Sequence, residues 1–224
     1  MKISCIIPAY NEADRIGKVL EVISNCPSID EIIVINDAST DNTKEIVLKY
    51  SNIILINQDN NYGKTKAVLL GLKRAKNDLI VMIDADLIGL SVKAVEDLIL
   101  PVLENKVGVT ISLRHNAYYL YKVLGIDFVS GERVFNKNLL LSKEKELLQI
   151  AKFGLEVFIN EEIISKKITT RIIRWDNVIS PRKFDKMGFF LGSIGDLEMT
   201  RQIFTTVPLE KCIRQIFALK KLSR

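Results

Sequence analysis

The chain has 224 residues, of which 48% are hydrophobic and 26% charged, so it carries enough apolar side chains for a folded core. Its 32 Lys and Arg against 27 Asp and Glu give a net charge of +5, which is too small an excess to indicate nucleic-acid binding. Three widely spaced cysteines and one histidine argue against a disulfide scaffold or a Cys/His zinc site. These counts predict a cytoplasmic protein.

The first half alternates short strands with helices. Apolar, β-branched runs predict strands over 3–7, 31–36, 53–57 and 79–84, and helical spacing predicts helices over 15–24, 42–50 and 64–76. Asn42, with Glu45 three residues later, and Ser91 are the expected helix caps. Strands that are apolar throughout are covered on both faces, so the pattern predicts an α/β fold with a mostly parallel sheet.

The second half is less regular. It predicts strands over 107–113 and 168–175, helices over 142–152 and 155–166, and a helical tail from residue 188 that is interrupted near Pro208. No linker or repeat separates the halves. We therefore expect one domain over residues 1–224, with a ligand-binding half at 1–105 and a second half at 106–224 that ends in a helical elaboration.

Polar side chains gather where the predicted strands of the first half end. They are Glu12, Asp37, Lys64, Asp84 and Asp86. Because open parallel sheets bind ligands outside the carboxyl ends of their strands, these groups are expected to meet in one site. Two carboxylates after a buried strand suit Mg²⁺ or Mn²⁺, which bind one or two carboxylates together with substrate phosphate oxygens.

Three other kinds of site fit the sequence poorly. Gly63-Lys64-Thr65 resembles the end of a P-loop, but the glycine that the P-loop needs five residues earlier is Gln58. The first strand is not followed by the glycine pattern of a dinucleotide site. His115, the single histidine, follows an apolar run and is expected in a turn, so a Ser-His-Asp triad is disfavoured.

Four segments together carry a resemblance to a known family. They are 6–12 (IIPAYNE), 36–43 (NDASTDNT), 61–67 (NYGKTKA) and Asp84-Ala85-Asp86. In this order they resemble the motifs of glycosyltransferase family 2 and its relatives, which implies a GT-A fold, a Rossmann-like sheet flanked by helices. The resemblance also implies a nucleotide-diphosphate sugar donor of the UDP or GDP type.

The resemblance assigns roles to the first-half residues. Those implied to bind the nucleotide sugar are Pro8, Ala9, Tyr10, Glu12, Asp37, Lys64, Asp84 and Ala85. Asp86 is implied to hold the metal and to face the diphosphate. Without a ligand-binding role, Lys64 would be a solvated lysine at the start of a helix.

The second half resembles polyprenyl-phosphate glycosyltransferases and glucosyl-phosphoglycerate synthases more loosely. Residues 127–133 (DFVSGER) and 153–157 (FGLEV) carry this likeness. It implies acceptor-side catalytic roles for Asp127 and Glu156, and acceptor contacts for Gly131 and Arg133. Ordinary turn and helix-start roles remain open for both acids.

One departure from the family concerns a metal ligand. Relatives commonly carry a histidine in the segment that resembles 177–183, and Ser180 stands in its place. Three functions therefore remain in view: a glycosyltransferase acting on a phosphorylated or polyprenyl-phosphate acceptor, a nucleotidyltransferase, and a weakened nucleotide-sugar-binding protein. The sequence leaves a homodimer open.

The last segment has an amphipathic pattern. Leu209, Cys212, Ile213, Ile216 and Phe217 recur at helical spacing among basic residues, which are Lys211, Arg214, Lys220, Lys221 and Arg224. Such a helix can lie on an anionic membrane. The alternative is that its apolar stripe packs on the domain, and the sequence favours that alternative.

Overall fold

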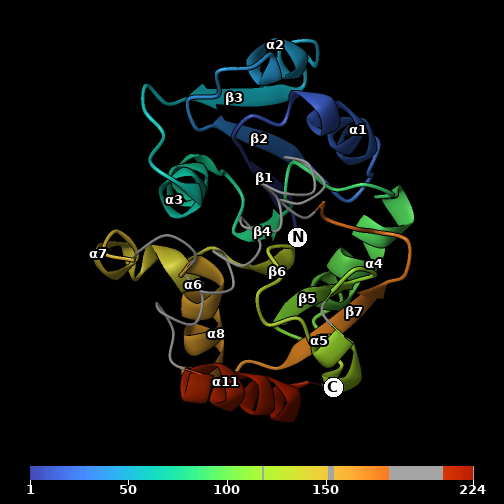
Figure 1. The fold of residues 1–224 in the computed structure, drawn as a ribbon, viewed down its shortest axis with the longest axis vertical. Coiled ribbons are helices and arrows are strands. Elements are labelled where there is room, and N and C mark those ends of the chain that lie inside the picture. Colours follow the sequence, from blue (N-terminus) through green and yellow to red (C-terminus); the bar gives the residue numbers. More distant parts are fainter. Residues whose placement is uncertain (118, 151–153, 182–208, 224) are drawn as a thin grey trace, which may run out of the picture.

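A computed structural model describes residues 1–117, 119–150, 154–181 and 209–223. Seven strands form one sheet (Figure 1). The strands are β1 (Ile3–Ala9), β2 (Glu31–Asn36), β3 (Ile53–Asn57), β4 (Leu79–Met82), β5 (Val109–Arg114), β6 (Arg133–Asn136) and β7 (Thr170–Trp175). Their order across the sheet is β3-β2-β1-β4-β6-β5-β7.

The sheet is mostly parallel. β1 pairs in parallel with β2 and β4, β2 with β3, and β5 with β7. β6 runs antiparallel to both of its neighbours, β4 and β5. The second half of the chain therefore continues the sheet of the first half through β6.

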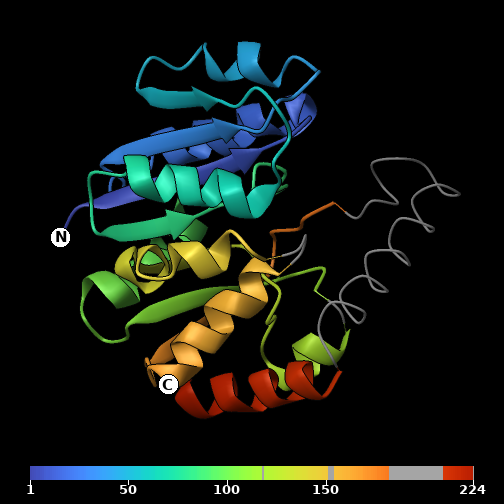
Figure 2. The ribbon, with the colours of Figure 1, turned by 90° about the vertical axis from the view of Figure 1, so that its left-hand side faces the viewer.

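Helices cover both faces of the sheet (Figures 1 and 2). α3 (Lys64–Arg74), α6 (Asn138–Leu141) and α8 (Leu155–Ser165) lie on one face, and α11 (Leu209–Leu222) packs on α8. α1 (Ala13–Ser24) and α4 (Val92–Leu103) lie on the other face. The short helices are α2 (Thr43–Val47), α5 (Tyr119–Leu124) and α7 (Glu144–Leu147).

Each face of the sheet has its own apolar cluster. On β1, Ile6 joins the cluster beneath α3 and α8, whereas Cys5 and Ile7 join the cluster beneath α1 and α4. Successive side chains of a strand point to opposite faces, so a strand covered on both sides is apolar throughout. This is why the strand runs of the sequence do not alternate.

α3 lies close to the sheet because of one glycine. A Cβ at Gly71 would lie 2.7 Å from Ile6 Cγ2 and 2.8 Å from Ile35 Cδ1. The absence of a side chain lets the helix approach the strands. The N-terminus of α3, at Gly63 and Lys64, is thereby fixed at the carboxyl edge of the sheet.

The structure confirms most predicted elements and corrects some. The predicted strands 31–36 and 53–57 have the observed bounds, and Ser91 Oγ caps α4 by accepting a hydrogen bond from the Ala94 amide. The predicted cap position Asn42 is confirmed as the N-cap residue of α2, but its side chain makes no capping bond, and Asp41 Oδ1 accepts from the Thr43 amide instead. Of the predicted helix over 142–152, the described residues up to 150 form only α7, and 151–152 lie outside the described residues. β6, α5 and α6 were not predicted.

The predicted C-terminal helix is present, but its apolar stripe is divided. Cys212 and Ile216 are buried in the core, whereas Ile213 is 47% and Phe217 61% exposed. The stripe thus packs in part on the domain, as the alternative reading predicted. The tail from 188 to 208 lies outside the described residues. Within the described part of the chain, no helix is both long and apolar enough to cross a membrane.

Candidate active site

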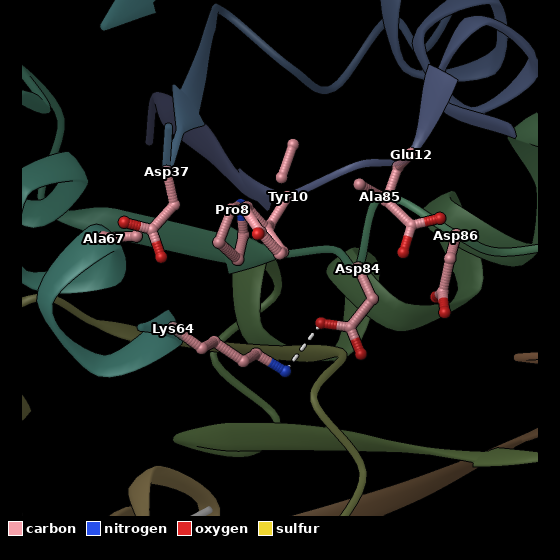
Figure 3. A pocket seen from close by; sticks show the side chains of 10 residues that line it. Pro8, Tyr10, Glu12, Asp37, Lys64, Ala67, Asp84, Ala85 and Asp86 are labelled. Atoms are coloured by element: carbon pink, nitrogen blue, oxygen red, sulfur yellow. Dashed lines mark ion pairs between the residues drawn. The ribbon is translucent and has the colours of Figure 1, made fainter. Parts of the chain in front are cut away.

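A cavity of about 210 Å³ opens at the carboxyl ends of β1, β2 and β4 (Figure 3). Its lining contains every nucleotide-sugar residue that the sequence predicted, together with the predicted metal ligand. The lining residues are Pro8, Ala9, Tyr10, Glu12, Asp37, Lys64, Ala67, Asp84, Ala85 and Asp86. The predicted convergence of the strand ends in one pocket is therefore confirmed, while the role of each side chain remains a prediction.

Asp37 organises one wall of this cavity. Its carboxylate accepts hydrogen bonds from the amides of Tyr62 and Gly63, both at 2.8 Å, and from Gln58 Nε2 at 2.7 Å. Gly63 has a φ of 88°, a backbone angle that glycine adopts without strain. Asp37 thus holds the loop that leads into α3, and one buried acid fixes where Lys64 begins the helix.

Lys64 is shared between two carboxylates. Its Nζ lies 2.7 Å from Asp84 Oδ1 (Figure 3). It also lies 2.9 Å from Oε1 of Glu156, at the start of α8. Burial opposes the ionisation of Asp84, but the Lys64 ammonium outweighs it and lowers the pKa of Asp84. The structure therefore brings Glu156, predicted from the second half, to the lysine of the first half.

Gly131 lies directly against this ion pair. A Cβ at Gly131 would lie 2.5 Å from Lys64 Nζ and 2.6 Å from Asp84 Oδ2. A side chain at this position would force the ends of Lys64 and Asp84 to move, so glycine leaves room for the ion pair as it stands. Gly131 thus sits at the site, as predicted, although the cavity lining does not include it.

Asp86 lies next to Ser180, the residue for which the sequence resemblance implied a histidine in relatives. Ser180 Oγ lies 3.3 Å from Asp86 Oδ1, because an antiparallel bridge between Ile88 and Ile179 holds the two segments together. Among the described residues, no group of three or more Asp, Glu, Cys or His could hold a metal ion. One carboxylate and one hydroxyl fit a divalent cation whose remaining ligands are oxygens of a bound diphosphate and water.

Two charged side chains at the site were not predicted. Arg114, at the end of β5, has NH2 3.2 Å from Asp127 Oδ2 and NH1 3.5 Å from Glu132 Oε1. Glu132 is fully buried and accepts hydrogen bonds from Ser112 Oγ at 2.6 Å and Ser130 Oγ at 2.7 Å. Burial raises the pKa of Glu132. The positive charge of Arg114 lowers this pKa, the negative charge of Asp84 raises it, and the net shift is upward. The sequence signal for Arg114 is its position at the end of a predicted strand, directly before His115.

Arg133 has no exposed surface. Its guanidinium donates hydrogen bonds to Ser130 O at 2.8 Å, Asn160 Oδ1 at 2.7 Å and Phe128 O at 2.9 Å. Burial lowers its pKa to about 10, so the side chain stays charged at neutral pH. The structure does not bring Arg133 to the cavity, and we leave it out of the proposed acceptor contacts.

The comparison with family models decides the family. The model of Glycosyl transferase family 2 matches residues 4–127, which contain the strand ends and acids of the cavity. The chain belongs to this family. This is the family that the motifs of the sequence resemble.

Curated relatives match a shorter stretch of this family member. A dolichyl-phosphate beta-glucosyltransferase of Trichomonas vaginalis is 39% identical over 97 residues, covering 38% of this chain and 30% of that protein. An undecaprenyl-phosphate 4-deoxy-4-formamido-L-arabinose transferase of Proteus mirabilis is 35% identical over 95 residues, covering 38% and 29%. The matched part is thus under a third of these relatives' length.

Solved structures extend the likeness to nearly the whole chain. Glucosyl-3-phosphoglycerate synthase from Mycobacterium tuberculosis, in complex with phosphoglyceric acid, superposes with a TM-score of 0.73 at 22% identity. The superposition covers 94% of this chain and 80% of that chain. Its complex with Mn²⁺, UDP and glucosyl-3-phosphoglycerate superposes with a TM-score of 0.71. The predicted α/β fold of the GT-A type is confirmed.

Proposed function

We propose that this family member transfers a sugar from a nucleotide-diphosphate sugar to a phosphorylated acceptor, which is lipid-linked or free. One observation carries the proposal: Lys64, at the N-terminus of α3, lies between the carboxylates of Asp84 and Glu156. Lys64 lines the same cavity as Asp37 and Asp86. A lysine at a helix N-terminus is suited to a departing diphosphate, because the ammonium and the helix dipole both favour negative charge.

The residues divide into a donor side and an acceptor side. Asp37 and the exposed ring of Tyr10 frame the nucleoside, and Lys64 stabilises the charge that develops on the diphosphate. We assign Glu156, which contacts Lys64, and Asp127, which is buried and pairs with Arg114, to the acceptor side. A phosphate oxygen is already ionised at neutral pH, so it can attack the anomeric carbon without a strong base.

The proposal includes a divalent cation, Mg²⁺ or Mn²⁺, with the carboxylate of Asp86 as its protein ligand. When bound with the diphosphate, it supplies further positive charge beside the leaving group. In support, a structural neighbour was solved with Mn²⁺ and UDP. Ser180 Oγ beside Asp86 offers a weaker ligand than a histidine, so a nucleotide-sugar-binding protein with little turnover is the second candidate.

Product analysis tests the proposal. The full chain is incubated with UDP-glucose or a GDP-sugar, Mn²⁺ or Mg²⁺, and either 3-phosphoglycerate or a polyprenyl phosphate in detergent. We expect nucleoside diphosphate release that depends on both acceptor and metal. Release of pyrophosphate would assign a nucleotidyltransferase, while nucleotide binding without turnover would assign the binding protein.

We also propose that α11 brings the chain to an anionic membrane surface, where a lipid-linked acceptor would be found. The exposed Ile213 and Phe217 lie one helical turn apart, and Lys220 and Lys221 are exposed on the same helix. Apolar side chains among lysines are the composition of interfacial helices.

Sedimentation with anionic liposomes tests this contact. Wild-type chain should sediment at low salt, and the double variant Ile213→Ser, Phe217→Ser should remain in the supernatant. Leu48→Ser is the matched control, since Leu48 is 62% exposed and follows α2, far along the chain from α11. Equal sedimentation of the double variant and the wild type would assign α11 a purely structural role.

A further inference from the structure

The loop over residues 127–132, which leads into β6, approaches Lys64 and Asp84 of the active site. It carries Asp127, which pairs with Arg114, and Gly131, which lies against Lys64. We infer that α11 positions this loop through a buried relay of side chains, Gln215 to Asn160 to Arg133. The relay makes Gln215 and Asn160 positioning residues of the site, although neither lines the cavity.

On the loop side, the relay holds two backbone carbonyls. Arg133 donates from Nε to Ser130 O at 2.8 Å and from NH2 to Phe128 O at 2.9 Å. Asn160 Nδ2 donates to the same Phe128 carbonyl at 2.8 Å. These bonds pull the carbonyls on either side of Val129 inward, which fixes the turn that presents Gly131.

On the helix side, one amide joins α8 to α11. Asn160 Oδ1 accepts from Arg133 NH1 at 2.7 Å, and Asn160 Nδ2 also donates to Gln215 Oε1 at 3.1 Å. Gln215 Nε2 in turn donates to Val157 O at 3.0 Å and to Glu161 Oε1 at 2.6 Å. Gln215 is thus held from both of its amide atoms.

Burial makes this arrangement selective. Arg133, Asn160 and Gln215 are each 0% exposed, so water cannot replace a lost partner. An unpaired buried amide or guanidinium is strongly unfavourable, and the set of bonds is therefore satisfied in one loop conformation. In this way α11, some eighty residues after Gly131 in the chain, sets how closely the loop approaches Lys64 and Asp84.

Hydrogen–deuterium exchange of the full chain tests the relay without reference to activity. Gln215→Met keeps the size of the side chain and removes its three hydrogen bonds, to Asn160, Val157 and Glu161. We expect exchange of the amides at 128–132 to accelerate by about threefold or more, with β1 unchanged, because opening of this loop becomes easier. Cys212→Ala is the matched control: Cys212 faces the core from the same helix but makes no relay bond.

A kinetic arm rests on the proposed function and is separable from the exchange arm. For Gln215→Met we expect a higher KM for the phosphorylated acceptor at unchanged UDP affinity.

Equal loop exchange in Gln215→Met and Cys212→Ala would overturn the relay, because the loop would then respond to helix docking in general. If Gln215→Met does not fold, Gln215→Asn, whose shorter amide cannot reach Asn160, takes its place with the same expectations. Faster exchange in a chain without turnover would retain the relay and reject only the proposed chemistry.

Discussion

At the scale of single residues, Lys64 carries the argument for a diphosphate. Replacing it with methionine leaves Asp84 and Glu156 facing each other without their shared cation. We expect Lys64→Met to weaken UDP binding at least about tenfold, which is ~1.4 kcal/mol, and uridine binding far less. Calorimetry with the two ligands measures the difference.

Lys73→Met is the control for this substitution. Lys73 lies on the same helix and makes an exposed ion pair with Glu144, 2.5 Å away. Its loss should leave both affinities unchanged. Equal losses for UDP and uridine in Lys64→Met would instead assign Lys64 to the architecture of the cavity.

Ser180 allows a gain-of-binding experiment. Its Oγ lies 3.3 Å from Asp86 Oδ1, so a histidine at this position brings an imidazole nitrogen beside the carboxylate. Imidazole is a stronger ligand for Mn²⁺ than a neutral hydroxyl. We expect Ser180→His to tighten Mn²⁺ binding in the presence of UDP by roughly tenfold.

The double variant Asp86→Asn, Ser180→His provides the check. Without the carboxylate, the imidazole alone should give no gain, and calorimetry with Mn²⁺ and UDP reports this directly. If Ser180→His binds Mn²⁺ no better than wild type while Asp86→Asn loses nothing, Asp86 is not a metal ligand.

At the scale of the elements, one acid joins two helix starts. Asp41 Oδ2 accepts from the Ala13 amide, the first residue of α1, and Asp41 Oδ1 accepts from the amide and hydroxyl of Thr43 in α2. Burial opposes the charge, but these hydrogen bonds outweigh it and lower the pKa of Asp41.

Asp41→Asn should therefore lower the free energy of unfolding by about 1 kcal/mol near neutral pH. A carboxyl whose folded-state pKa is lowered stabilises the fold above its unfolded-state pKa, near 4, and loses this contribution as the pH falls through the folded-state value. Urea denaturation between pH 7 and pH 3.5 should show the difference between variant and wild type shrinking below about pH 4. A difference that grows on acidification contradicts the capping role.

Asp41 also shows what local pattern can and cannot predict. The sequence placed the N-cap of α2 correctly at Asn42, but it did not predict that Asp41 accepts the capping hydrogen bond, because that bond depends on the path of the chain from α1. Strands such as Glu31–Asn36 were predictable, since burial on both faces leaves an unbroken apolar run. β6 was not, because a strand of four residues that begins with arginine and ends with asparagine has no such run.

The same limit applies within the site. The acids at the strand ends could be placed together because parallel strands share one carboxyl edge. The burial of Arg133 could not be foreseen, since its partners Asn160 and Phe128 come from a helix and a loop whose packing no short-range pattern encodes. Glu132 was not predicted for the same reason, since its partners Ser112 and Arg114 come from β5.

At the scale of the whole molecule, the two halves share one sheet. The edge of β4 that faces away from β1 is covered by β6, and the cluster beneath α3 includes Phe135, Leu139 and Ile159 from the second half. We expect a chain ending at residue 105 to lack a stable fold, because it exposes that edge and this apolar face. Circular dichroism and urea titration of the shortened chain check this.

A cooperative unfolding transition in the shortened chain would contradict this expectation and make residues 1–105 an independent unit. Addition of UDP and Mn²⁺ serves as the control, since a ligand that binds only the folded state raises apparent stability by mass action.

The place of β6 also matters while the chain is being made. The ribosome completes β4 at Met82 and must add some fifty residues before β6 ends at Asn136. At roughly 5–20 residues per second, this interval lasts several seconds. During it the backbone amides and carbonyls of β4 have no strand beside them on one side, and an open edge is a template for pairing with another chain. We therefore expect nascent copies of this protein to be most prone to aggregation while the segment between these two strands is being added, midway along the chain.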